Sequence, residues 1–417
     1  MMTNSSITGK RIEKVPFAGI RKVADRAAEL AAKGVKVIHF EAGRPDFDTP
    51  IHIKEAAKEA LDQGIVYYAP SAGIPALREA LAARISEEKG VRFGPQEIIV
   101  TGGGQQAIYL SLICILDPGD EVLVPDPGYS TFPWTVHLAG GVPVVVDAVP
   151  AENFSFDLEA AAKAVTPKTR AMLVNSPHNP SGSVFTREQL EKIAAFAARH
   201  NLIIVSDEAY DRLVYGGSVH YSLASFPGIR ERTIVCGSFS KTYAMTGWRI
   251  GYVAAPEPMI SAATRAQQNL VLSLNSFVQM GAIAALTQSQ TPTVDMIQEF
   301  GRRRKLVLDR LQQVPGLELE NRPYGGFYIF PKITVPYVTS AQLAEYLLET
   351  AGVAVVDGSV FGRNGNGHIR LSYACSYENC VEGMERLTAA MKKLVAEKKV
   401  CTSTLTGRKC TRLGGRG

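Results

Sequence analysis

The 417-residue chain lacks an apolar run of the roughly 18 residues that a membrane-spanning helix needs, and its start contains no hydrophobic signal segment. Cysteines are few, six in all, with no CxxC pair and no metal-ligand spacing among them. None of the seven histidines has a ligand partner at helical spacing. These absences predict a cytoplasmic protein with reduced thiols, no membrane contact and no metal site.

Apart from its last twenty residues, the chain also lacks a large net charge. The formal net charge is +5, but residues 398–417 carry six lysines and arginines and no acidic residue. The other 39 basic residues are balanced by 40 acidic ones, which is not typical of a protein that binds nucleic acid. Residues 399–417 are rich in Gly, Ser, Thr and Arg and are predicted to form a disordered basic tail. Contact of this tail with an acidic partner is the alternative.

Apolar strand-like runs alternate with helical ones along the first two thirds of the chain. The runs are EIIVTGGG (97–104), DEVLVPDPGY (120–129), RAMLVNSPHNPSG (170–182), NLIIVSDEAY (201–210) and RTIVCGSFSK (232–241). Continuous Val and Ile runs separated by helices predict a mostly parallel sheet that is covered on both faces, as in α/β proteins. Such sheets bind ligands at the carboxyl ends of their strands, where each of these runs carries polar residues or glycine.

The length of the chain exceeds what one hydrophobic core usually supports, so two domains are expected. We expect residues 45–294 to form the large domain. From residue 295 the pattern changes to a long helix, short strands such as GGFYIFPKI (325–333) and GHIRLSYA (367–374), and a final helix. These features predict a smaller α+β domain formed by residues 1–44 and 295–398.

Several residues with reactive or anion-binding groups follow these strands directly. Lys241 stands between small hydroxyl residues after a buried run, and Asp207 ends another, where a carboxylate requires a cationic partner. Arg249 can bind an anion, as can the hydroxyl groups of the serines near Lys241. Gly103 and Gly104 permit a tight turn at a helix start, where free backbone N–H groups favour phosphate. Together these groups predict a pocket for a phosphorylated, cationic ring that captures a lysine.

In these motifs the chain strongly resembles the pyridoxal-phosphate-dependent aminotransferases of class I, which have fold type I. The resemblance runs from about Ile12 to Lys398 and includes GRPDF, YYAPSAGIPALREA, ILDPGDEVLVPDPGY, NSPHNPSG, SDEAY, SFSKTYAMTGWRIGY and HIRLSYA. The ordered set is specific, whereas the generic phosphate motifs GxGxxG and GxxxxGK[ST] are absent. The resemblance implies pyridoxal 5'-phosphate (PLP) as cofactor and an amino acid and a 2-oxo acid as substrates.

The resemblance also implies a role for each motif residue. Lys241 would form the Schiff base and shuttle a proton, Asp207 would pair with the pyridine nitrogen, and Tyr210 and Asn179 would donate to the ring oxygen. Tyr129 would stack on the ring. The phosphate would be held by a group of six residues: Gly103, Gly104, Gln105, Ser238, Ser240 and Arg249. Each residue also has an ordinary structural alternative, such as a helix cap for Asp207, a core aromatic for Tyr210 or a turn for the glycines.

Other matches concern the substrate and the partner subunit. Arg370 would clamp the substrate carboxylate and Gly43 would let the backbone approach it, while Tyr68 would reach the phosphate of the neighbouring subunit of a homodimer. The family more often has an acidic residue at the position of Arg44, and its aspartate-preferring members often have lysine at that of Gln105. An uncharged or aromatic side chain is favoured by apolar and aromatic residues expected near the opening: Phe17, Ile20 and Tyr324.

The predicted reaction is transfer of an amino group from an L-amino acid to a 2-oxo acid in two ping-pong steps. A PLP-dependent β-lyase acting on cysteine conjugates is the alternative, because the same lysine and ring serve both reactions. Release of pyruvate and ammonia would indicate the lyase. A DNA-binding regulator with an aminotransferase-like domain is disfavoured, because the motifs begin within about the first forty residues and leave no room for a helix-turn-helix domain.

Overall fold

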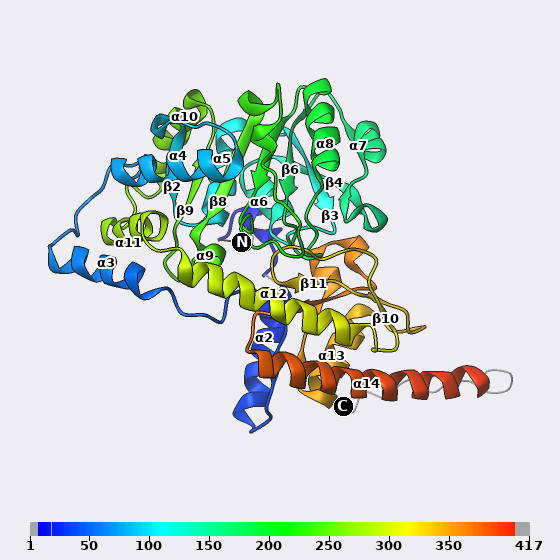
Figure 1. Ribbon diagram of the computed structural model, residues 1–417. Helices are drawn as coiled ribbons and strands as arrows, with labels where there is room; N and C mark the ends of the chain where they lie inside the picture. The colour runs from blue at the N-terminus through cyan, green and yellow to red at the C-terminus, as the bar shows by residue number, and fades with distance from the viewer. Residues whose placement is uncertain (1–6, 18, 405–417) are drawn as a thin grey trace, which may run out of the picture.

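A computed structural model describes residues 7–17 and 19–404 (Figure 1). Its centre is an eight-stranded sheet with the order β2-β9-β8-β7-β6-β3-β4-β5. The strands are β2 (Ile98–Thr101), β3 (Glu121–Asp126), β4 (Val142–Val149), β5 (Ser155–Phe156), β6 (Thr169–Asn175), β7 (Ile203–Asp207), β8 (Thr233–Ser238) and β9 (Gly251–Ala254). The pairs among β4, β3, β6, β7 and β8 are parallel, whereas β9 and β5 pair antiparallel with their neighbours. The predicted mostly parallel α/β sheet is confirmed.

Helices cover both faces of this sheet because its strands are apolar on both sides. Ile99 and Val205 face a core shared with α5 (Gly104–Ile115), α6 (Phe132–Leu138) and α10 (Glu257–Leu270). On the opposite face, Ile98 packs with α4 (Pro75–Lys89) and α11 (Ser276–Thr287), and Ile204 packs with α8 (Arg187–Arg199). Adjacent residues of one strand thus enter different cores, as the period of two in a strand requires. Two further helices, α3 (Ile51–Asp62) and α7 (Leu158–Ala164), complete this layer.

A separate hydrophobic core lies beside the sheet and joins the two ends of the chain. It brings Ile38 and Phe40 together with Phe300, Val307 and Leu343. Its helices are α12 (Thr291–Leu311), α13 (Ser340–Ala351) and α14 (Tyr377–Thr404), and its strands include β11 (Tyr328–Ile329) and β15 (Ile369–Ser372). Strand β14 (Val356–Asp357) pairs antiparallel with β15. Strand β1 (Ile38–His39) pairs parallel with β13 (Val353–Ala354), and α2 (Gly19–Ala32) lies beside this group (Figure 1). This core supports the expected two-domain division, which stays a prediction.

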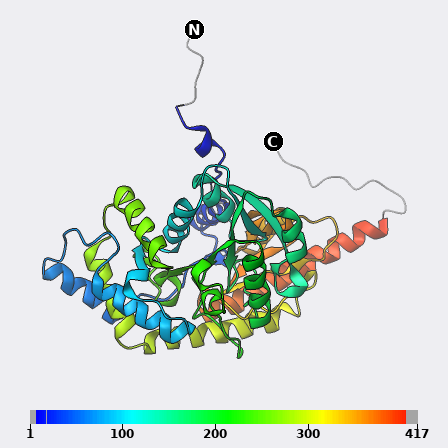
Figure 2. The same ribbon diagram turned by 90° about the horizontal axis from the view of Figure 1, so that it is seen from above.

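The two ends of the described chain lie at the periphery. Figure 2 shows the short helix α1 (Lys10–Glu13) extending away from the body of the molecule. Helix α14 continues into the first part of the predicted basic tail; the rest of that tail, residues 405–417, lies outside the described residues. No described helix is both long and apolar enough to span a bilayer.

Candidate active site

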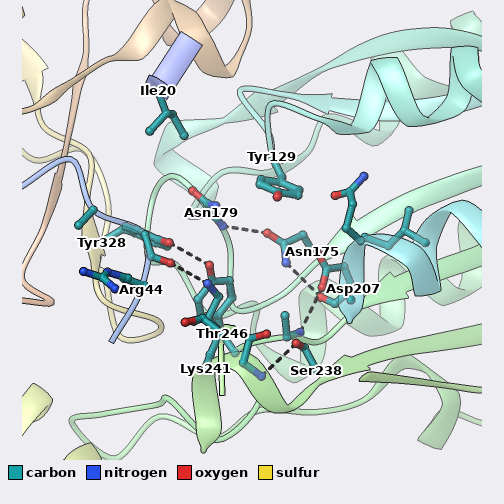
Figure 3. Close-up of a pocket in the computed structure, with 18 of the residues that line it drawn as sticks. Ile20, Arg44, Tyr129, Asn175, Asn179, Asp207, Ser238, Lys241, Thr246 and Tyr328 are labelled. Atoms are coloured by element: carbon teal, nitrogen blue, oxygen red, sulfur yellow. Dashed lines mark hydrogen bonds between the residues drawn. The ribbon is translucent and has the colours of Figure 1, made fainter. Parts of the chain in front are cut away.

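A cavity of about 480 Å³ lies where the parallel strands of the sheet end (Figure 3). The chain leaves β6, β7 and β8 at this edge, so Asn175, Asp207 and Ser238 end neighbouring strands and face one space. Twelve of the predicted site residues line it: Gly43, Gly104, Gln105, Tyr129, Asn179, Asp207, Tyr210, Ser238, Ser240, Lys241, Arg249 and Arg370. Residues separated by more than 300 positions in the chain are therefore brought together.

Lys241 projects into this cavity from α9 (Phe239–Thr242), the single helical turn that follows β8. The turn begins at Ser238, whose hydroxyl accepts a hydrogen bond from the backbone N–H of Ser240 at 3.2 Å. The Nζ atom of Lys241 donates to the carbonyl oxygen of Gly43 at 2.6 Å. Burial, followed by the positive charges of Arg370 and Arg249, lowers the pKa of Lys241 to about 8. A substantial fraction of its amine is therefore neutral and nucleophilic near pH 8.

Asp207 is buried at the end of β7 and lacks a cation in direct contact among the described residues. Its carboxylate accepts a hydrogen bond from the backbone N–H of Ala209 at 3.1 Å. Burial raises the pKa of Asp207 to about 7, and the negative charge of Glu208 adds to the effect. A cationic group placed beside this carboxylate would restore its ionised form.

The turn between β2 and α5 forms an anion-binding end of the cavity. Gly103 has φ of +95° at the start of α5, and an added Cβ atom there would lie 2.5 Å from Nη2 of Arg249. Only glycine meets both conditions. The free N–H groups at the start of α5, the hydroxyl groups near Lys241 and the Arg249 guanidinium group all suit a phosphate. Arg249 is held by the carbonyl oxygens of Thr246 and Gly102, each at 3.1 Å.

Arg370 reaches the cavity from β15, on the side formed by the second core. Its Nη2 group donates to the carbonyl oxygen of Glu41 at 2.8 Å and its Nη1 group to Oδ1 of Asn179 at 3.2 Å. The guanidinium group lies 4.4 Å from the ring centre of Tyr328, and its buried Nε atom has no partner among the described residues. A buried, planar donor of this kind is suited to bind a carboxylate.

Polar contacts fix the residues between these two ends. The hydroxyl groups of Tyr210 and Tyr328 lie 2.9 Å apart. Asn175 accepts from the backbone N–H of Asn179 at 2.8 Å and donates to the carbonyl oxygen of Asp207 at 3.1 Å. Since Oδ1 of Asn179 binds Arg370, its Nδ2 group is left to donate to a ligand.

Gln105 and Tyr129 line the remaining side. The side-chain amide of Gln105 forms hydrogen bonds with two threonine hydroxyl groups. Its oxygen accepts from Thr131 at 2.9 Å and its nitrogen donates to Thr135 at 2.8 Å. The ring of Tyr129 packs edge-on against Phe132, with ring centres 5.4 Å apart. In Figure 3, Tyr129 and Lys241 lie on opposite sides of the cavity that both residues line.

Comparison with known proteins agrees with this geometry. Residues 35–387 match the model of the family described as aminotransferase class I and II. The chain belongs to this family. It is 44% identical to an aspartate aminotransferase of Pyrococcus abyssi over 94% of this chain and 98% of that protein. It is 42% identical to an aromatic-amino-acid aminotransferase of Thermococcus litoralis, over 94% and 98% of the two chains.

The aminotransferase fold is shared with solved structures. The aspartate aminotransferase of Thermus thermophilus with maleate gives a TM-score of 0.87 at 41% identity, covering 92% of this chain and 99% of that one. The fold is therefore of the aspartate aminotransferase type, and the chain is an aminotransferase enzyme. This confirms the predicted family, fold class and reaction class. The roles of individual residues stay predictions.

Some residues expected at the site of this aminotransferase lie outside the cavity. Gly103 is not among the lining residues, although it lies beside Arg249, which is one of them. Tyr68 is 80% exposed and does not line it. Of the three apolar and aromatic residues expected near the opening, Ile20 lines the cavity, whereas Phe17 is 91% exposed and Tyr324 packs on Arg304.

Other lining residues of the aminotransferase site were not predicted. Asn175, Tyr328 and Thr246 are examples, and Glu41 joins them from the segment beside Gly43. Asn175 ends a buried strand, which is the same signal that identified Asp207. Tyr328 gave no such signal, because an aromatic residue in GGFYIF is equally typical of a core.

Proposed function

We propose that this aminotransferase uses PLP as its cofactor and that Lys241 is the residue to which the cofactor is attached. The observation that carries the proposal is one cavity that holds a buried lysine of lowered pKa, a buried carboxylate and an anion-binding helix start. Bound PLP supplies an aldehyde that condenses with amines and a cationic ring that takes up negative charge.

The residues present fit this cofactor at both of its ends. The Asp207 carboxylate, with one backbone donor among the described residues, is complementary to a protonated pyridine nitrogen. The N–H groups at the start of α5, with Ser238, Ser240 and Arg249, are complementary to a phosphate. The rings of Tyr129 and Tyr210 supply apolar walls between the two ends.

Different residues of the cavity would bind the substrate, transfer the proton and hold the cofactor. Arg370 binds the carboxylate of the amino acid and fixes its α-carbon near Lys241. The Lys241 Nζ atom, once displaced by the substrate amine, would accept the α-proton from the substrate carbon and pass it to the cofactor, a task suited to an amine of pKa about 8. Tyr210 and Asn179 would hold the cofactor by hydrogen bonds, and the hydroxyl group of Tyr328 fixes that of Tyr210.

We infer that the substrates are L-amino acids with acidic or aromatic side chains, together with the matching 2-oxo acids. Relatives named for aspartate and for aromatic amino acids support this choice. So does the mixed lining near the opening, where Ile20 and Ala24 are apolar and Arg44 is cationic. Gln105 is held by two threonines, so it is not positioned as the main contact for an acidic side chain.

We also infer a homodimer with shared sites. Val66, Tyr67 and Tyr68 are 63–80% exposed and Leu270 and Val271 are 44–50% exposed, which is unusual for large apolar side chains. The segment of the tyrosines is linked to this second group through Ser71, whose hydroxyl donates to the carbonyl oxygen of Leu272 at 2.8 Å. A second cavity of about 850 Å³ adjoins the first, and the exposed Arg249 of the phosphate end lines both cavities.

A half-reaction screen tests the proposed function. Single L-amino acids, with aspartate, glutamate, phenylalanine and tyrosine first, are added to the PLP-loaded protein while the cofactor absorbance is followed. We expect conversion to the amine form with release of one 2-oxo acid per site, and reversal by a 2-oxo acid. Absence of conversion by every amino acid, or release of pyruvate and ammonia from a cysteine conjugate as the main reaction, would contradict it.

A further inference from the structure

A buried cluster of titratable residues lies outside the cavity lining. It is formed by Lys89, Glu208, Asp211 and His220. Lys89 is the last residue of α4, where lysine is normally exposed, yet its side chain is only 2% exposed. A lysine buried this deeply requires compensating negative charge.

The contacts of the cluster supply that charge. The Lys89 Nζ atom donates to Oε2 of Glu208 at 2.7 Å and to Oδ2 of Asp211 at 2.5 Å. His220 contacts the same Oε2 atom at 3.2 Å. The second oxygen of Glu208 accepts from the hydroxyl groups of two serines, Ser206 at 2.9 Å and Ser222 at 2.7 Å. The ammonium group thus has two carboxylate partners, and both oxygens of Glu208 are occupied.

Electrostatics keep Lys89 and Glu208 charged. Burial favours the neutral form of Lys89, but Asp211 and Glu208 outweigh it and raise the pKa of Lys89 well above its ordinary value. Burial likewise favours the neutral form of Glu208, but Lys89 and His220 outweigh it and lower the pKa of that carboxyl. Buried ion pairs seldom stabilise a protein more than an apolar replacement does, so fixed geometry is a more direct explanation for this one.

The cluster holds the turn that carries two predicted cofactor contacts. Glu208 directly follows Asp207, and Asp211 directly follows Tyr210. The turn is closed by the backbone N–H of Asp211, which donates to the carbonyl oxygen of Glu208 at 3.1 Å. Asp207 and Tyr210 line the cavity, whereas Glu208 and Asp211 are directed to Lys89. One ammonium group therefore fixes the turn at both of its ends.

We propose that Lys89 is a positioning residue for the cofactor, because its ammonium group clamps Glu208 and Asp211 and thereby places Asp207 and Tyr210 in the cavity. This inference rests on the proposed function, since it assumes that both residues contact PLP. Lys89 itself touches neither the cavity nor the reacting atoms.

The test compares Lys89→Met with Arg230→Met in the full chain. Arg230 also belongs to a partly buried ion pair, with Glu97 at 2.7 Å, but it does not contact the turn at Asp207. We expect Lys89→Met to raise the dissociation constant for PLP at least tenfold and to change the visible circular dichroism of the bound cofactor, which reports the orientation of its ring. Arg230→Met should change the dissociation constant for PLP by less than about twofold and should leave the dichroism spectrum unchanged. A folded Lys89→Met protein with the PLP affinity and dichroism of the wild type would overturn the inference.

A charge-balanced variant keeps the test valid if Lys89→Met does not fold. The triple substitution Lys89→Met, Glu208→Gln and Asp211→Asn removes the ammonium group together with both of its carboxylate partners, so it avoids the penalty of a buried carboxylate without a cation. It should fold and still show weaker PLP binding and altered dichroism. Wild-type values of both would again overturn the inference. Failure of the wild-type protein to bind PLP would instead contradict the proposed function.

Discussion

At the scale of single residues, the site depends on two buried groups whose pKa values are displaced in opposite directions. The pKa of Lys241 is lowered to about 8, while that of Asp207 is raised to about 7. Burial is the main cause in both cases, and it favours the neutral form of each group. A neutral amine attacks an aldehyde, and a buried carboxylate gains most from a cationic partner. The same desolvated environment therefore makes the Lys241 amine more nucleophilic and makes the Asp207 carboxylate favour a cationic ligand.

The lowered pKa of Lys241 predicts how the apoprotein captures PLP. The attacking form is the neutral amine, which is populated above its pKa, so the capture rate should rise with pH and level off above about pH 8. Arg370→Met removes a positive charge that lowers this pKa, so the inflection should move to higher pH. Stopped-flow absorbance measures the rate, with the exposed Arg363→Met as control. An inflection that stays in place in Arg370→Met would contradict this explanation.

At the scale of elements, the functional groups are placed by the ends of strands and helices. Three adjacent parallel strands, β6, β7 and β8, end in Asn175, Asp207 and Ser238. The start of α5 contributes free N–H groups, and β15 brings Arg370 from the other core. Each element is fixed by its own buried residues, so the site is assembled by packing distant from the chemistry.

Gly103→Ala tests the turn before α5. The substitution adds a side chain at φ of +95° and 2.5 Å from Arg249, so it should cost about 1–3 kcal/mol and raise the dissociation constant for PLP about tenfold or more. Gly119→Ala is the matched control, because Gly119 has φ of +94° but nothing within 4 Å of an added Cβ atom. Denaturant unfolding and PLP titration measure both effects. Equal PLP affinity in the two variants would show that crowding of Arg249 is unimportant.

Arg370→Lys tests whether Arg370, on β15, binds the carboxylate of the substrate. The variant keeps the charge but loses the planar pair of donors, so reaction with every amino acid should slow about 10–100-fold, whatever the side chain. Amines that lack a carboxylate should react at an unchanged rate. Single-turnover rate constants for matched amino acids and amines make the comparison. Equal slowing of amines, or slowing of only one class of side chain, would rule out a carboxylate clamp.

At the scale of the whole molecule, the cavity combines the central sheet with the core that joins the two ends of the chain. Lys241 comes from the sheet region and Arg370 from the second core. A substrate held by both would bridge them, which favours closure and exclusion of water. The exposed apolar segment at Tyr68 extends the same argument to a second subunit.

Mixing Lys241→Ala chains with Tyr68→Ala chains tests the shared site of the proposed dimer. In a heterodimer of Lys241→Ala and Tyr68→Ala chains, one site carries both defects, and the other has an intact Lys241 and an intact Tyr68 from its partner. Refolding the two variants together should therefore restore roughly a quarter of the wild-type activity by random assortment. Transaminase assays before and after mixing give the result. No gain over the separate variants would contradict a site shared between subunits.

The sequence predicted much of the sheet and most of the cavity, because strand ends carry a clear signal. A charged or glycine residue after a continuous Val and Ile run identified Asp207, Lys241 and the turn at Gly103. Tyr328 was missed because its neighbours in sequence are also aromatic or apolar. Lys89 was missed because a lysine at the end of a polar helix is normally exposed; its partners lie about 120 positions away and are brought close only by folding.

The most direct test of the central claim is to locate the covalent bond between cofactor and protein. The PLP-loaded protein is reduced with borohydride, digested and mapped by mass spectrometry, with Lys241→Ala treated in parallel. We predict one stable adduct per chain, on Lys241, and none in the variant, which should still bind PLP non-covalently through the phosphate-binding residues. An adduct on another lysine, or no adduct in a protein that catalyses amino transfer, would contradict the account.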